Sequence, residues 1–214
     1  MLVGERMTHP VITTAPDTPI TNALKLMRQE KIRRMPVIKD GKLVGIVSDK
    51  DLLNASPSSA TSLSIWEMNY LLSKITIEDV MTQDVLTVTA DTTLEKAARI
   101  MADNKIGGLP VTDGDKVVGI ITETDIFKVF LELMGARNPG IRVAALVPEK
   151  RGELAKLTRA VSEIGGNFVA FGQFAGDDTS NREITFKVHG VSEEDVREAI
   201  EPYVDKIKDI RTCP

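Results

Sequence analysis

The sequence predicts a protein of mixed α+β and α/β class, with two copies of a β-α-β-β-α unit followed by a third unit of order βαββαβ. Three observations predict this arrangement. The chain is similar to itself at an offset of 74 residues. Short apolar segments alternate with segments whose apolar residues recur at helical spacing. An Asn-Pro-Gly linker signal at 138–140 separates the repeated part from the remainder.

The internal repeat aligns without a gap. The offset pairs Met7-Thr8 with Met81-Thr82, Pro36-Val37 with Pro110-Val111, Gly45 with Gly119, and Asp51 with Asp125. Roughly a third of the aligned positions are identical, well above the handful expected by chance. We therefore expect residues 1–62 and 77–135 to form two domains of one fold, with a connector helix in 63–76 and a different domain in 140–214.

Each copy is expected to contain the same elements in the same order. In the first copy an extended segment at 11–12 precedes a helix whose first position is Pro19. Two strands follow at 35–38 and 43–47, joined by a hairpin turn, and a second helix opens at Asp51. In the second copy Thr92-x-x-Glu95 predicts a capping box at the start of the equivalent first helix.

The segment between the copies predicts a loop followed by a short helix. Residues 54–62 are small and polar, and Ser64-x-x-Glu67 then caps an amphipathic stretch that carries Ile65, Met68 and Leu72. A connector packed on the core is favoured over a functional lid.

The third unit predicts a ferredoxin-like antiparallel sheet covered by two helices. Strands are expected at 141–147, 167–174, 182–188 and 204–211. The apolar face of the first helix carries Leu154, Leu157, Val161 and Ile164. Ser192-x-x-Asp195 predicts the cap of the second helix.

The bulk composition predicts a cytoplasmic protein. The formal net charge is −4 and the isoelectric point is near 5.4, which gives no indication of a nucleic-acid partner or an anionic membrane surface. Cys213 is the single cysteine of the chain, so no internal disulfide is expected. No apolar run approaches the roughly 20 residues that span a bilayer, and the first residues lack a signal-peptide pattern.

Both copies resemble CBS domains, and the third unit resembles an ACT domain. The CBS resemblance rests on Met-Thr-x-x-Val, then Pro-Val, then Gly-x-x-[Ser/Thr]-x-x-Asp, all present twice in register. The ACT resemblance rests on 150–155 and on Gly165-Gly166-Asn167. Two CBS units usually pair into one Bateman module with a cleft between them. The order of domains is similar to that of acetoin-utilisation B-type proteins.

The strand-to-helix junctions of the repeat are the candidate binding elements. Ser48-x-x-Asp51 alone is also a plain capping box, which is the ordinary interpretation of a single such motif. A helix N-terminus also offers N–H groups and a positive dipole to a phosphate. Because CBS pairs bind adenosine-type ligands, the resemblance implies one site at Ser48 and Asp51, and a second at Thr122 and Asp125.

The two sites are expected to differ in charge. The first copy has Arg33-Arg34 where the second has Gly107-Gly108, and Lys50 where the second has Thr124. Arginine binds phosphate bidentately, so the Asp51 site is expected to prefer the more phosphorylated ligand. A solvated turn is an equally good interpretation of the arginines.

The resemblance also implies that each site borrows residues from the opposite copy. This adds Thr82, Asp84 and Leu86 to the Asp51 site, and it adds Thr8, Pro10 and Ile12 to the Asp125 site. Gly107 completes the set of candidate binding residues.

The ACT resemblance implies a homodimer and allows an amino acid ligand near Gly152 and Asn167. A tight turn and a helix stop explain these two residues equally well. Many ACT domains only dimerise.

No catalytic or metal-binding constellation is expected, and we predict a non-enzyme. His9 and His189 lie in different domains, and no Walker glycine loop is present. One hypothesis is a regulator that senses AMP, ADP or ATP, with NAD or S-adenosylmethionine as further candidates, and acts on an unknown target protein. The alternative is an interaction scaffold or accessory subunit with no physiological ligand.

Overall fold

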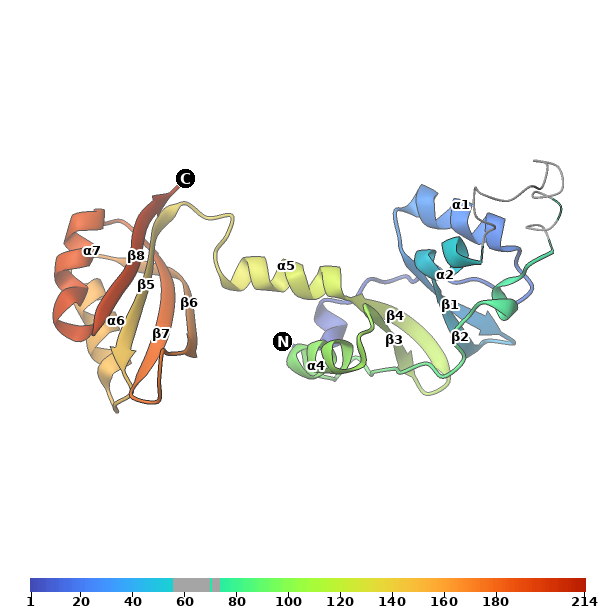
Figure 1. The fold of residues 1–214 in the computed structure, drawn as a ribbon, viewed down its shortest axis with the longest axis horizontal. Helices are drawn as coiled ribbons and strands as arrows, with labels where there is room; N and C mark the ends of the chain where they lie inside the picture. Colours follow the sequence, from blue (N-terminus) through green and yellow to red (C-terminus); the bar gives the residue numbers. More distant parts are fainter. Residues whose placement is uncertain (56–69, 71–73) are drawn as a thin grey trace. The chain divides into compact units, whose positions relative to one another are not determined.

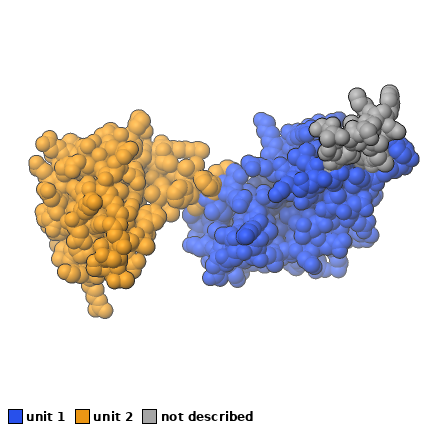
Figure 2. All heavy atoms as spheres, in the orientation of Figure 1, with its two compact units in different colours: residues 1–126 blue, residues 127–214 orange. Residues whose placement is uncertain are grey.

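The structure is a computed structural model that describes residues 1–55, 70 and 74–214. It consists of two compact units, Met1–Ile126 and Phe127–Pro214 (Figure 2). The division falls within one helix, α5 (Glu123–Leu133). Most of the predicted connector helix, 63–69 and 71–73, lies outside the described residues, so its role remains a prediction.

Both copies of the repeat fold into a helix, a β-hairpin and a second helix (Figure 1). The first copy comprises α1 (Ile20–Glu30), β1 (Arg34–Lys39), β2 (Lys42–Ser48) and α2 (Asp49–Asn54). The second comprises α4 (Leu94–Asn104), β3 (Gly108–Asp113), β4 (Lys116–Thr122) and α5. The two hairpins are antiparallel and share a register shift at equivalent positions, after Val37 and after Val111. The duplication seen in the sequence is therefore a duplication of structure.

The prediction of a first β-strand in each copy is wrong, because this segment forms no regular ladder. The extended segment makes a single parallel bridge, from Thr14 to Val37 in the first copy and from Val88 to Val111 in the second. A turn begins two residues later in both copies, so the chain leaves the hairpin before a ladder can form.

The predicted starts of the first helices are wrong by one residue. Pro19 is the N-cap of α1 rather than its first residue, and Thr93, not Thr92, caps α4 by accepting a hydrogen bond from the Lys96 N–H at 3.3 Å. Pro19 and Thr93 both form isolated β-bridges, which hold their backbones extended and delay the helix.

The two copies exchange their first residues. A short 3₁₀ turn in the first copy, η1 (Val3–Glu5), bonds to the second copy through Val3 N–H and Thr92 O at 2.8 Å. Its equivalent, η2 (Ile77–Asp79), bonds to the first copy through Ile77 N–H and Thr18 O at 2.9 Å. Ile77 is fully buried in the core of the first copy. The first copy therefore does not complete its core alone.

The second unit has the predicted element order βαββαβ. Its elements are β5 (Gly140–Pro148), α6 (Glu153–Glu163), β6 (Asn167–Ala175), β7 (Asn181–His189), α7 (Glu193–Ile200) and β8 (Lys206–Cys213). The strands lie in the order β6-β7-β5-β8, and all neighbours are antiparallel. The two helices cover one face of this sheet (Figure 1), and the core lies between them.

The helices of the second unit mostly follow the sequence pattern. Leu157 and Val161 are buried, but Ile164 caps the end of α6 and is 38% exposed, so its predicted place on the buried face is wrong. The capping box of α7 is confirmed, because Ser192 Oγ donates to Asp195 Oδ2 at 2.6 Å. No helix in the described part of the chain is long and apolar enough to cross a bilayer.

Candidate ligand-binding cleft

The first junction joins β2 to α2 through a complete capping box. Asp51 Oδ2 accepts hydrogen bonds from the Ser48 N–H at 2.8 Å and from Ser48 Oγ at 2.6 Å. Ser48 Oγ in turn accepts from the Asp51 N–H at 3.3 Å. These bonds fix the carboxylate of Asp51 at the end of β2, and the predicted cap is confirmed.

The second junction repeats this arrangement between β4 and α5. Asp125 Oδ2 accepts from the Thr122 N–H at 3.0 Å and from Thr122 Oγ1 at 2.7 Å. Asp125 is buried, with 7% of its surface exposed, whereas Asp51 is half-buried. The first carboxylate is therefore the more accessible to a ligand.

Each junction lies beside a segment of the opposite copy. Ile46 in β2 exchanges two backbone hydrogen bonds of 2.9 Å with Thr82. Ile120 in β4 does the same with Thr8, at 2.8 and 3.1 Å. Backbone hydrogen bonds therefore hold the first segment of each copy beside the junction of the other copy.

The repeated glycine of each junction makes room for this crossing. A Cβ on Gly45 would lie 2.5 Å from Met81 Sδ, and one on Gly119 would lie even closer to Met7 Sδ. A side chain at either position would displace the methionine of the other copy. Glycine and methionine therefore recur at equivalent positions of the two copies because each glycine leaves room for a methionine side chain of the other copy.

A cleft of about 470 Å³ opens at the first junction. Its lining contains every residue predicted for the Asp51 site and also Gly107, together with seven others. The full lining comprises Arg33, Arg34, Ile46, Val47, Ser48, Asp49, Lys50, Asp51, Thr82, Asp84, Val85, Leu86, Lys105, Ile106, Gly107 and Gly108. Residues from both copies thus surround one cavity.

The cleft combines cationic and anionic groups. Its lining carries four cations and three carboxylates, and sequence reasoning missed Lys105 among the cations and Asp49 among the carboxylates. Lys105 follows α4 in a left-handed conformation, with φ of 54°. It directly precedes Ile106 and Gly107, and its approach to a junction of the other copy carries no local signal in the sequence.

Arg34 extends from the first copy onto the second. Its Nη2 lies 4.0 Å from Glu123 Oε2, at the start of α5. A Cβ on Gly107 would overlap this guanidinium, so the glycine provides the space that Arg34 occupies. The paired arginines and glycines of the two copies therefore meet at one place in the structure.

The predicted residues of the second site are less completely assembled. Thr8 lies beside β4, and Thr122 and Asp125 are hydrogen-bonded. Pro10 is exposed, and Ile12 packs against the core of the first copy. A ligand pocket at Asp125 remains a prediction.

The comparison with known families decides the assignment of the first unit. A model of the CBS domain matches residues 3–58 and 77–132. The chain belongs to the CBS-domain family. The chain spans 47% and 64% of the length of the first two curated relatives that it matches.

Three solved CBS-pair structures are similar to this chain. CBSX2 of Arabidopsis thaliana in complex with AMP is 36% identical, with a TM-score of 0.52 and coverage of 62% of this chain and 97% of that one. The CBS pair of MJ0100, in complex with 5-methylthioadenosine and S-adenosyl-L-methionine, is 31% identical, with a TM-score of 0.52 and coverage of 64% and 98%. A candidate acetoin utilization protein, AcuB, from Vibrio cholerae is 33% identical, with a TM-score of 0.53 and coverage of 64% and 95%.

Proposed function

We propose that the chain is a non-catalytic regulatory protein that binds an adenosine-containing ligand, AMP, ADP or ATP, in the Asp51 cleft. The observation that carries this proposal is the presence of a fixed carboxylate and several cations around one cavity of about 470 Å³. This volume lies within the range of about 300 to 1,000 Å³ that small-molecule sites show. The ligands of the CBSX2 and MJ0100 structures support the chemical class.

The lining offers a distinct partner for each part of a nucleotide. Asp51 uses two of its roughly four acceptor positions on Ser48, which leaves capacity for ribose hydroxyls. Arg33, Arg34 and Lys50 would bind the phosphates through charge-assisted hydrogen bonds. The adenine base would pack against the apolar side chains of the lining that are not fully buried, which are Ile46, Val85, Leu86 and Ile106.

Calorimetric titration of AMP and ATP into Asp51→Ala and Asp125→Ala tests the assignment. Loss of the Asp51 carboxylate is expected to weaken AMP binding about tenfold or more, because a hydrogen bond to a charged group is lost. Asp195→Ala is the matched control, since it removes the same capping carboxylate from α7 in the other unit.

The proposal fails if AMP and ATP bind Asp51→Ala and Asp125→Ala as tightly as the parent chain. The comparison of the two variants also tests the predicted asymmetry. ATP affinity should depend more strongly on the Asp51 side, where the arginines lie.

We further propose that the second unit is an ACT domain that mediates homodimerisation. Its element order and its strand order β6-β7-β5-β8 support this, as a ferredoxin-like sheet covered on one face by α6 and α7. The two residues predicted to contact an amino acid have other roles here. Gly152 is the N-cap residue of α6, with φ of 88°, and the Asn167 amide nitrogen lies 3.2 Å from His189 Nε2. Sedimentation equilibrium should give twice the chain mass of 23.4 kDa; a mass of one chain at all concentrations would refute the dimer.

The similarity to AcuB supports a link to acetoin metabolism. The competing hypothesis is a scaffold or accessory subunit without a ligand. A thermal-shift screen with AMP, ADP, ATP, NAD and S-adenosylmethionine separates the two, because a ligand that binds only the folded state raises the melting temperature. A flat response to all five favours the scaffold.

A further inference from the structure

We infer that the second unit carries a separate binding site for a small organic anion, on the sheet face opposite α6 and α7. A cavity of about 420 Å³ lies there. The lining residues that matter for recognition are Met134, Ala136, Arg142, Thr185, Lys187 and Cys213. None of them belongs to the proposed nucleotide cleft.

The alternation of side chains places the polar groups of this site on one face. In β5 and β7, Val143 and Phe186 point into the core beneath the helices. Their neighbours along the strands, Arg142, Thr185 and Lys187, therefore point to the other face. Arg142 is paired directly with Lys187 across the two strands.

Lys187 is a buried cation that has no carboxylate partner among the described residues. Only 6% of its surface is exposed, and its Nζ donates to the carbonyl oxygens of Gly135 at 2.9 Å and Asn138 at 2.8 Å. No ion pair joins it to any acidic group in the described part of the chain. A buried charge is costly unless it is paired, and an anion in the adjacent cavity would supply the missing charge and accept the third N–H.

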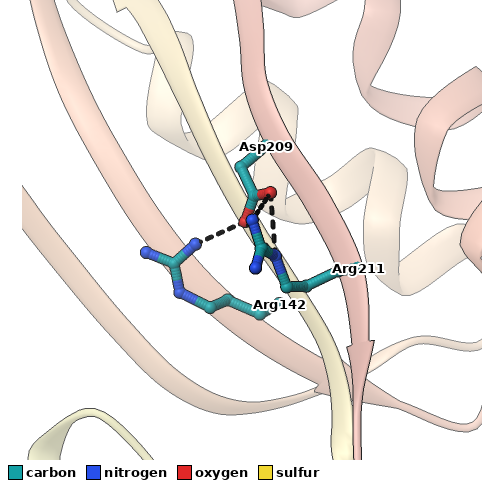
Figure 3. Close-up of polar contacts among 3 residues, drawn as sticks. All are labelled: Arg142, Asp209 and Arg211. Atoms are coloured by element: carbon teal, nitrogen blue, oxygen red, sulfur yellow. Dashed lines mark hydrogen bonds and ion pairs between the residues drawn. The ribbon is translucent and has the colours of Figure 1, made fainter.

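Arg142 adds a second cation with unused donors. Arg142 Nη1 donates to Asp209 Oδ2 at 2.7 Å, and Arg211 also points at Asp209 and donates to both of its oxygens (Figure 3). Two guanidinium groups thus share one carboxylate. A guanidinium has five N–H donors, so Arg142 can bind a further oxyanion while it holds Asp209.

The remaining lining defines the class of ligand. Thr185 adds a hydroxyl-bearing residue to the lining, with 5% of its surface exposed. Met134 and Ala136 supply apolar surface. The geometry therefore fits a small molecule with a carboxylate or phosphate group and an apolar body.

The site also bears on the segment that follows α5. Lys187 holds the backbone of Gly135 and Asn138, so a ligand that draws on the Lys187 ammonium acts on the same group that fixes this segment. Binding would reach the segment between α5 and β5, within the second unit, without a contact to the nucleotide cleft.

The rate at which Cys213 reacts with N-ethylmaleimide tests the site on the full chain, since Cys213 lines the cavity and is the single cysteine. The probes are isovalerate and inorganic phosphate, each compared with chloride at equal ionic strength. Either probe should slow the reaction in a saturable way, and Arg142→Gln should raise the half-saturating concentration about tenfold or more. Lys206→Met removes an exposed cation from the same sheet and should behave like the parent chain.

Protection by isovalerate alone assigns the site to organic carboxylates, and protection by phosphate assigns it to phosphates. Absence of protection by both probes, or protection by chloride to the same extent, overturns the proposal. The proposal is also overturned if the probes protect Cys213 in Arg142→Gln and in Lys187→Met as well as they do in the parent chain. AMP affinity should be unchanged in Arg142→Gln, so failure here is distinguishable from failure of the proposed nucleotide site.

Discussion

At the scale of single residues, the asymmetry between the copies is concentrated in a few positions. Arg34 of the first copy occupies the space beside Gly107 of the second, and both line the same cleft. In the sequence they belong to two adjacent differences between the repeats, since Arg33 aligns with Gly107 and Arg34 with Gly108. In the structure Arg34 and Gly107 contact each other, because the Arg34 guanidinium occupies the space that a Cβ at position 107 would fill.

Gly107→Ala is expected to weaken AMP binding about tenfold or more while leaving adenosine binding nearly unchanged. The new Cβ displaces the Arg34 guanidinium, which would bind phosphate but not the nucleoside. Calorimetry with both ligands measures this difference. Arg34→Gln should reproduce the effect and Arg28→Gln, an exposed arginine of α1, should not. An equal loss for AMP and adenosine would argue against a phosphate role for Arg34.

The N-cap serines of α2 and α7, Ser48 and Ser192, allow the effect of a lost cap on stability to be separated from its effect on AMP binding. Ser48→Ala and Ser192→Ala should each lower the free energy of unfolding by about 0.5 to 2 kcal/mol, since each removes a helix cap. Only Ser48→Ala should also weaken AMP binding, because Ser48 positions the Asp51 carboxylate. Urea unfolding and AMP titration of both variants provide the measurement, and a loss of AMP affinity in Ser192→Ala would contradict the assignment.

At the scale of elements, the repeat is held together by exchanged segments. The residues before each extended segment pack on the opposite copy, and the bridges between Ile46 and Thr82 and between Thr8 and Ile120 bind them there. The glycine–methionine contacts lie at the same crossings. Local pattern predicted the helices and hairpins correctly in order, but the one-residue shifts at Pro19 and Thr93 arise from these long-range bridges.

A double-mutant cycle between Gly45 and Met81 tests the crossing. Gly45→Ala alone should destabilise the chain by roughly 1 to 3 kcal/mol, because the added methyl group displaces Met81. In a Met81→Ala background the same change should cost about 1 kcal/mol less, since the clashing side chain is gone. Additive effects on the free energy of unfolding would show that the two residues do not touch.

At the scale of the whole molecule, two units with different chemistry follow each other along the chain. The first carries the cleft in which we propose that a nucleotide binds, and the second carries a sheet whose face opposite α6 and α7 bears arginine and lysine side chains. Hydrogen bonds from Arg211, with the charges of Arg211 and Arg142, hold the pKa of the Asp209 carboxyl below its usual range. That shift links the stability of the second unit to pH.

Protonation of Asp209 should lower the free energy of unfolding in acid, because the stabilising contacts of its carboxylate are lost. Since the pKa of Asp209 is depressed in the folded state, its contribution is present above the unfolded-state value of about 3.9 and is lost as the pH falls through the lower folded value. Asp209→Asn should therefore flatten the fall in the free energy of unfolding below pH of about 4. Urea unfolding at several pH values, with Glu198→Gln as an exposed control, measures this slope. An unchanged slope in Asp209→Asn would show that the carboxylate does not contribute.

By itself the sequence determined the duplication, the order of helices and hairpins, the capping boxes at Ser48 and Ser192, and the carboxylate at each junction. These features are local or repeat at a fixed offset, so periodicity and capping chemistry reveal them. Only the tertiary structure decided that Lys105 and Asp49 join the cleft, that Ile12 packs in a core, and that Lys187 faces a second cavity. Those outcomes depend on contacts between residues far apart in the chain, where close packing rather than local pattern decides which side chains meet.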